Sequence, residues 1–123
     1  MTEQAITQQV MKQRTKSYAL RVIRVVSSLQ NNVVGRNIGG QLLRAGTSVA
    51  ANYRAACRAR SRADFLSKLG IVEEETDESL FWQELLVEAG ILEPAKLVKL
   101  MKEGNEILSI IVATRKTVRA SRT

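Results

Sequence analysis

The arginines between residues 54 and 62 are the side chains whose type and spacing most clearly suggest chemistry. Arg54, Arg58 and Arg62 are four residues apart, so on one helix their guanidinium groups would form a row along one side. Such a row can neutralise successive phosphates of a nucleic acid and release the counterions condensed there. Further cations that could extend the row are Lys12, Lys16, Arg21, Arg24 and Arg60. Aromatic residues make up only 4% of the chain, which leaves no stacking platform for single-stranded bases. We therefore predict salt-sensitive binding to a nucleic-acid backbone.

The sequence lacks the residues on which most enzyme chemistry depends. It contains no histidine and a single cysteine, so neither a Ser-His nor a Cys-His nucleophile pair is available. A metal site built from cysteines is excluded by the same count, and the acidic run at residues 73–78 lacks the imidazole ligands of a di-iron bundle. Gly35, Gly39 and Gly40 are not followed by the Lys-Ser/Thr ending of a phosphate-binding loop. We expect a protein that is not an enzyme, with no catalytic residues, no cofactor and no metal.

The cellular compartment is suggested by the cysteine count and by the N-terminal residues. Cys57 has no second cysteine with which to form an intrachain disulfide, and this fits a reducing compartment. The first ten residues have neither a basic start nor an apolar run of signal length. No segment approaches the roughly 20 consecutive apolar residues that a membrane span needs. We expect a soluble, cytoplasmic protein.

The pattern of apolar residues indicates four helices in one domain, residues 1–123. The spacing predicts helices over about 3–30, 36–59, 62–89 and 94–119. Ser61 and Asp64 match a capping box at the start of the third helix, Gly90 and Ile91 fit a Schellman ending, and Pro94 suits a first turn. Because the links are short, sequential helices should be antiparallel, and the expected fold is an all-α, up-down-up-down four-helix bundle.

The same spacing predicts which side chains face the core. For the first helix they are Ala19, Val22, Ile23, Val26 and Leu29, extended toward the N-terminus by Ile6 and Val10; for the second, Ile38, Leu42, Ala45, Val49, Asn52 or Tyr53, and Ala56; for the third, Phe65, Leu69, Val72, Thr76, Leu80, Gln83, and Leu86 or Val87; for the fourth, Leu97, Met101, Gly104, Leu108, Ile111 and Val118. Other apolar residues widen these stripes, namely Leu20, Val25, Leu66, Ile107, Ile110 and Val112. Apolar residues on a second helix face indicate either a thick core or a subunit interface, and we favour the interface.

Charge is strongly segregated along the chain, whose formal net charge is +7. Residues 1–62 contain eleven Lys or Arg and one acid, whereas residues 63–93 contain one base and nine acids. Residues 94–123 contain seven bases and two acids. Two interpretations of the acidic third helix remain open: its carboxylates form a solvated face, or they pair with arginines of neighbouring helices and so occupy them.

The second predicted helix contains the motif Gln41-Leu-Leu-Arg-Ala-Gly-Thr-Ser-Val-Ala-Ala-Asn-Tyr-Arg-Ala-Ala, and the third begins Asp64-Phe-Leu-Ser-Lys-Leu. With Tyr18-Ala-Leu-Arg-Val-Ile before them, these segments resemble the 23S rRNA intervening-sequence proteins over roughly residues 15–86. The resemblance implies an up-down-up-down bundle that is commonly a ring-shaped homopentamer. A distant relative, the accessory variability protein of diversity-generating retroelements, is a basic pentamer that binds nucleic acid and a reverse transcriptase. The family has no established catalytic residues, so none is carried over.

Three polar residues of the motif lie four apart on or beside the buried side of the second helix: Arg44, Ser48 and Asn52. Buried polar groups need hydrogen-bond partners. We therefore interpret them as a structural network that fixes the helix register, with ligand binding as the alternative.

Two hypotheses about function follow. The first is a non-enzymatic, oligomeric helical bundle that binds RNA or DNA through basic helix faces, as an accessory to ribosomal RNA insertions or mobile elements. The alternative is a protein–protein interaction scaffold whose charged faces serve only assembly and a protein partner such as a reverse transcriptase.

Overall fold

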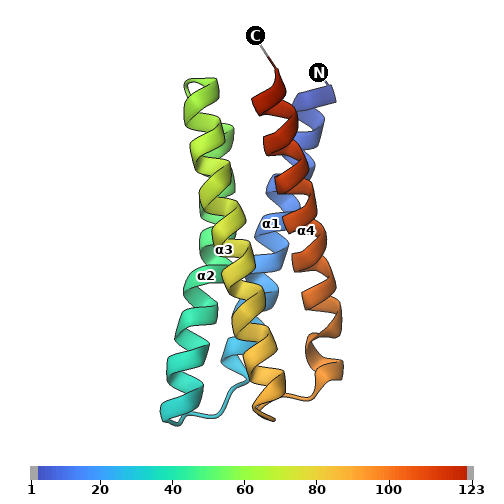
Figure 1. The fold of residues 1–123 in the computed structure, drawn as a ribbon. Coiled ribbons are helices and arrows are strands. Elements are labelled where there is room, and N and C mark those ends of the chain that lie inside the picture. The colour runs from blue at the N-terminus through green and yellow to red at the C-terminus, as the bar shows by residue number, and fades with distance from the viewer. Residues whose placement is uncertain (1–2, 122–123) are drawn as a thin grey trace.

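The computed structural model describes residues 3–121, with side chains from residue 7 onward, and over that range it consists of four helices and no strand. The helices are α1 (Glu3–Ser27), α2 (Val33–Cys57), α3 (Arg62–Glu88) and α4 (Pro94–Ala120). They run alternately down and up, and each packs beside the next, with α4 returning to α1 (Figure 1). The predicted all-α, up-down-up-down bundle is confirmed. The start of α1, the end of α4 and the α2–α3 link lie at the same end (Figure 1).

The link between α1 and α2 differs from the prediction in a way that Asn32 explains. We expected α2 to begin near residue 36, but it begins at Val33. Asn32 is its N-cap, and the side chain of Asn32 accepts a hydrogen bond of 2.8 Å from the Gly35 N–H. Asparagine stabilises a helix start in this way as readily as it interrupts a helix. α1 accordingly ends at Ser27, three residues before the predicted end.

The predicted N-cap and the predicted Schellman ending of α3 are confirmed, but only half of the capping box forms, because the Asp64 carboxylate pairs with Lys68 and makes no recorded bond back to the Ser61 N–H. The Ser61 hydroxyl accepts from the Asp64 N–H at 3.0 Å and caps the first turn. At the other end Gly90 has a φ of +73°. The N–H of Ile91 donates to the Leu86 carbonyl, also at 3.0 Å, as in a Schellman motif. The chain then turns into α4, whose first turn contains Pro94.

The predicted core is correct for most of α2 and α3 but partly wrong for α1 and α4. On α1 Ile23 and Val10 remain 40% and 52% exposed, and the core is filled instead by Met11, Thr15 and Tyr18. The side chain of Ile6, also assigned to the inner stripe, lies outside the described residues. On α4 Ile107, which we had assigned to a second face, is fully buried. α1 is therefore rotated about its axis so that Thr15 and Tyr18 face the core. Their burial is tolerated because their hydroxyl groups form hydrogen bonds inside the bundle.

A chain of buried hydrogen bonds crosses the interior from α3 to α1. The amide nitrogen of Gln83 donates to the Tyr18 hydroxyl at 2.8 Å, and that hydroxyl lies 2.8 Å from the Ser79 hydroxyl. Because Ser79 uses its own hydrogen to bond the Thr76 carbonyl, Tyr18 must be the donor to Ser79. The three side chains of Tyr18, Ser79 and Gln83 are fully buried, so the chain fixes α1 against α3.

No helix among residues 3–121 is both long enough and apolar enough to cross a membrane.

Candidate nucleic-acid interface

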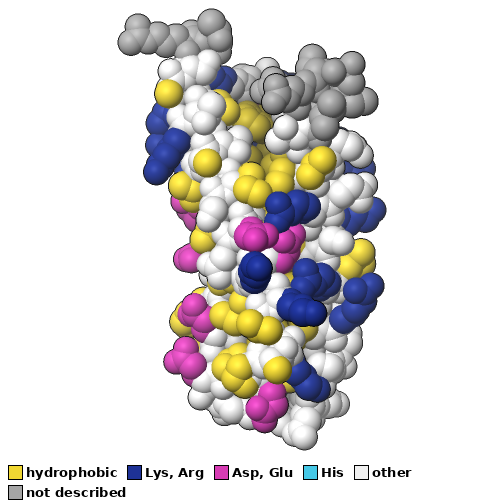
Figure 2. Space-filling view, turned by 90° about the vertical axis from the view of Figure 1, so that its right-hand side faces the viewer, with side chains coloured by type: hydrophobic (Ala, Val, Ile, Leu, Met, Phe, Trp, Pro, Cys, Tyr) yellow, Lys and Arg dark blue, Asp and Glu magenta, His cyan; other side chains and the backbone are white. Residues whose placement is uncertain are grey.

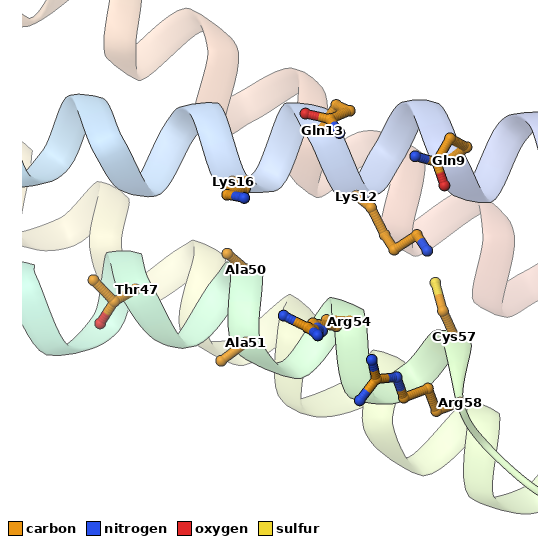
Figure 3. A pocket seen from close by; sticks show the side chains of 10 residues that line it. All are labelled: Gln9, Lys12, Gln13, Lys16, Thr47, Ala50, Ala51, Arg54, Cys57 and Arg58. Atoms are coloured by element: carbon orange, nitrogen blue, oxygen red, sulfur yellow. The ribbon is translucent and has the colours of Figure 1, made fainter.

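A groove of about 490 Å³ lies between α1 and α2 and brings together four of the predicted cations. Lys12 and Lys16 line it from α1, and Arg54 and Arg58 line it from α2 (Figure 3). Its other lining residues are Gln9, Gln13, Thr47, Ala50, Ala51 and Cys57. No acidic residue is among the described residues that line this groove.

The antiparallel packing of α1 and α2 explains why cations about forty positions apart in sequence meet here. On each helix the two cations are one turn apart, so they lie on the same side. The helices approach closely because Gly46 has no side chain: a Cβ there would lie 2.7 Å from a methyl group of Val22. In the groove Ala50 extends toward α1, while the guanidinium groups of Arg54 and Arg58 lie on the α2 side (Figure 3). Two pairs of cations therefore flank a floor of small side chains.

The acidic residues of α3 pair with other bases and leave the four groove cations without a recorded ion pair. Arg44 binds Glu75 at 2.9 Å and also Glu78, and Arg115 binds Glu73 at 2.8 Å. None of the salt bridges among the described residues involves a groove cation. The interpretation in which α3 occupies the groove arginines is therefore not supported.

The predicted row of Arg54, Arg58 and Arg62 is divided by the end of α2. Arg58 is the C-cap of α2, and Arg62 is the first residue of α3. The Arg62 guanidinium donates to the carbonyl of Ser121 at the end of α4, away from the groove. Such a row requires one helix that continues through residue 62, beyond the predicted end of the second helix at residue 59.

The three remaining predicted cations lie outside the groove. Arg60 lines a second cleft, of about 380 Å³, together with Arg54, Arg58, Asp64 and Lys68. The hydrogen bond from Lys68 is the main cause of the lowered pKa of Asp64, and the charge of Arg60 contributes. The charge of Arg21 helps to lower the pKa of Glu103 on α4. Arg24 is exposed on α1.

Cys57 is half-buried in the groove wall, and Lys12 and Gln9 extend toward it from α1 (Figure 3). Burial raises the pKa of its thiol, and a hydrogen bond from Tyr53 and the charge of Lys12 partly offset this rise.

Arg44, Ser48 and Asn52 do not form one network. Arg44 pairs with carboxylates of α3, and its hydrogen bond is the main cause of the lowered pKa of Glu78. Asn52 donates to the Ser48 carbonyl within α2, at 2.9 Å. The buried polar network of this bundle is the one around Tyr18, which the sequence analysis did not find.

The residues missed in the groove are the polar neighbours of the cations. Gln9 and Gln13 precede Lys12 and Lys16 by three residues each, and Thr47 is two turns before Arg54. Helical spacing would have placed them beside the cations, but only with the pairing of α1 and α2 known. With amide, hydroxyl, ammonium and guanidinium groups, the groove is suited to hold an anion such as a phosphate. Among the described residues no group of three or more His, Cys, Asp or Glu could hold a metal ion.

Comparisons with known proteins agree with this fold. The family profile described as 23S rRNA-intervening sequence protein matches residues 7–113. A crystal structure of a protein with unknown function from the S23 ribosomal protein family, from Bacteroides thetaiotaomicron, is similar to this chain. It has 31% sequence identity and a TM-score of 0.82, covering 86% of this chain and 98% of that one. No curated protein matches the chain. With a match over most of its length, the chain belongs to the 23S rRNA-intervening sequence protein family.

Proposed function

We propose that this protein is a non-enzymatic, cytoplasmic and oligomeric helical bundle that binds the phosphate backbone of RNA or DNA in the groove between α1 and α2. The observation that carries this proposal is the meeting of Lys12, Lys16, Arg54 and Arg58 in one groove with no acidic lining residue. The name of the family supports a role near ribosomal RNA insertions, where the protein would be an accessory to that RNA or to a mobile element.

The geometry of the four cations favours contact with consecutive phosphates. One helical turn separates Lys12 from Lys16 and Arg54 from Arg58, about 6 Å along each helix axis. This is close to the distance between neighbouring phosphates on one strand, so each pair can follow two phosphates. Gln9, Gln13 and Thr47 can add hydrogen bonds to phosphate or sugar oxygens.

The groove favours the backbone over the bases. No aromatic residue lines it, and single-stranded nucleic acids are usually held by stacking of bases on aromatic rings. The interaction should therefore depend strongly on salt and weakly on sequence.

A salt titration tests the proposal. With four phosphate contacts in each protomer, the logarithm of the binding constant for duplex DNA should fall with the logarithm of salt concentration with a slope of about −3 to −4 per protomer. The double substitution Lys12→Gln and Lys16→Gln should make that slope less negative by about 2. Duplex RNA, duplex DNA and a single strand of equal length would be compared by fluorescence anisotropy.

A matched control removes the same charge elsewhere. Lys96 and Lys99 are exposed in the first turns of α4, at the opposite end of the bundle from the groove. Their replacement by glutamine should leave the slope nearly unchanged. Failure to retain any RNA or DNA at about 50 mM salt would refute the proposal, as would equal losses in the two double variants.

The scaffold alternative is kept because α3 also presents charged residues that have no recorded partner within the bundle. It predicts that Arg54→Glu or Arg58→Glu alters the size of the oligomer without altering nucleic-acid retention. If retention is lost while the oligomer stays intact, the scaffold alternative fails.

A further inference from the structure

The outer face of α3 carries a single stripe of exposed residues that the bundle does not use. Its members are Glu74, Asp77, Phe81, Glu84 and Glu88, spaced three and four residues apart. All five are exposed, and Phe81 is 48% exposed. We call this set the acidic stripe.

The ion pairs inside the bundle are made by a different set of α3 acids. Glu73, Glu75 and Glu78 pair with arginines of α4 and α2. No salt bridge recorded within residues 3–121 involves a carboxylate of the acidic stripe. The acids on the sides of α3 that face α2 and α4 are thus neutralised by arginines, whereas the four carboxylates of the acidic stripe are not.

Phe81 is held in place although it is exposed. Its ring packs edge-on against Trp82, with the centroids 5.0 Å apart. The Trp82 indole N–H donates to Glu78 at 3.2 Å, which ties this pair of rings to the side of α3 facing α2. An ordered aromatic side chain surrounded by charges has the form of an interface anchor, because little entropy is lost when it is covered.

A surface of opposite character lies on the α1/α2 side, beside the groove. Leu20 is four residues beyond Lys16 on α1, and Leu43 is four residues before Thr47 on α2, so both continue the groove-lining sides of their helices. Leu20 is 46% exposed, Leu43 is 37% exposed, and the nearby Ile23 is 40% exposed. Gly40 lies one turn before Leu43 on α2, and a Cβ added there would meet nothing within 4 Å.

Cations border these apolar side chains. Arg24 follows Ile23 on α1, and Arg36 is two turns before Leu43 on the same side of α2. Both arginines are exposed, and neither takes part in a salt bridge recorded among the described residues. We call this set the basic patch: Leu20, Ile23, Arg24, Arg36, Gly40 and Leu43.

We propose that the acidic stripe of one copy docks on the basic patch of a second copy of this chain, with Phe81 against Leu20, Ile23 and Leu43. Charge complementarity identifies the occupant, because each face repels its own kind and matches the other. The two faces lie on different sides of the bundle, so the contact is head-to-tail and closes into a ring or continues as a filament. The inference rests on the oligomeric state proposed above and assigns its interface.

The view onto α4 agrees with this division of charge. Acidic side chains follow much of its left margin, where α3 lies, and basic side chains gather toward the right, where α1 lies (Figure 2). Basic side chains also lie on the upper part of the left margin, and acidic ones near the middle of this face, so the division holds mainly for the two margins below that point (Figure 2).

Mixing two charge-reversed variants tests the interface. The first variant, Asp77→Lys with Glu84→Lys, has two basic faces, and the second, Arg24→Glu with Arg36→Glu, has two acidic faces. Each alone should be monomeric by light scattering under conditions in which the unchanged protein is oligomeric. An equimolar mixture should associate again into species larger than a monomer, because each contact between the two variants joins opposite charges. Alternating variants close only rings with an even number of members, so the mixture should give open chains or even-numbered rings rather than the expected pentamer.

A second pair of variants tests the apolar anchor without changing charge. Phe81→Ser should raise the protein concentration needed for assembly at least tenfold. Val98→Ser, which changes an α4 residue that is 59% exposed, should leave that concentration unchanged. Helical circular dichroism would verify that each variant is folded. Because all these residues are exposed, the bundle itself should be unaffected.

The outcomes separate this inference from the proposed function. A monomeric unchanged protein would overturn both the oligomer and its interface. An oligomer that survives in each charge-reversed variant alone, or a mixture that stays monomeric, would overturn the interface only. Nucleic-acid retention by the groove is measured independently, through Lys12 and Lys16.

Discussion

Gly104 shows how strongly one missing side chain constrains the interior. A Cβ at this position would lie 2.8 Å from the Tyr18 hydroxyl oxygen and 2.8 Å from a methyl group of Leu80. Tyr18 cannot easily move, because Ser79 and Gln83 hold its hydroxyl. The sequence placed Gly104 on the inner side of its helix, but the need for glycine depends on the position of Tyr18, which sequence spacing does not give.

A pair of alanine substitutions at the residue scale separates packing from helix propensity. Gly104→Ala should destabilise the bundle, because overpacking costs about 1–3 kcal/mol and outweighs the propensity gain of about 1 kcal/mol. Gly40→Ala, where a Cβ meets nothing within 4 Å, should instead stabilise it by up to about 1 kcal/mol. Urea denaturation would measure both. If Gly104→Ala were as stable as the unchanged protein, Tyr18 would have another accessible position.

At the scale of elements, the helices were predictable and their rotation was only partly so. The ends of α3 could be predicted because Ser61, Gly90 and Pro94 act through local backbone chemistry. The inner side of α1 could not, because apolar spacing favoured Ile23 over Tyr18. What decides between them is the partner that α3 provides for the Tyr18 hydroxyl, and this is a tertiary contact.

The α1–α4 seam depends on one ion pair in particular, because these two helices contact each other least among neighbours. Arg14 of α1 donates to both carboxylate oxygens of Glu103 on α4, at 2.6 and 3.0 Å, and also binds Glu106. The hydrogen bond from Arg14 is the main cause of the lowered pKa of Glu103, whose ordinary value is 4.5.

This pair predicts a pH dependence of stability. Since the folded pKa of Glu103 lies below the unfolded one, its contribution is present above pH 4.5 and is lost as the pH falls through the folded value. Glu103→Gln should cost up to about 1 kcal/mol at pH 7, as expected for a partly exposed pair. The difference should shrink below pH 4.5. Denaturation curves across pH for both proteins would show this, and parallel pH profiles would contradict it.

On the scale of the whole molecule, the sequence showed that charge is segregated but not which charged side chains form ion pairs and which face outward. The counts for residues 63–93 indicated an acidic helix, and both interpretations of it apply to different residues. The side chains toward α2 and α4 pair with Arg44 and Arg115, whereas the acidic stripe faces outward. Which acids pair depends on how α3 is rotated about its axis, and the sequence does not give that rotation.

The position of the single cysteine offers a chemical footprint of whatever occupies the groove. Cys57 is half-buried beside Lys12, so a small thiol reagent modifies the protein at one place only, slowly because burial raises the thiol pKa. A duplex bound across the groove should slow alkylation several-fold, as measured by intact mass, and should not protect the Lys12→Gln and Lys16→Gln double variant. An unchanged alkylation rate in a protein saturated with nucleic acid would place the bound strand on another face.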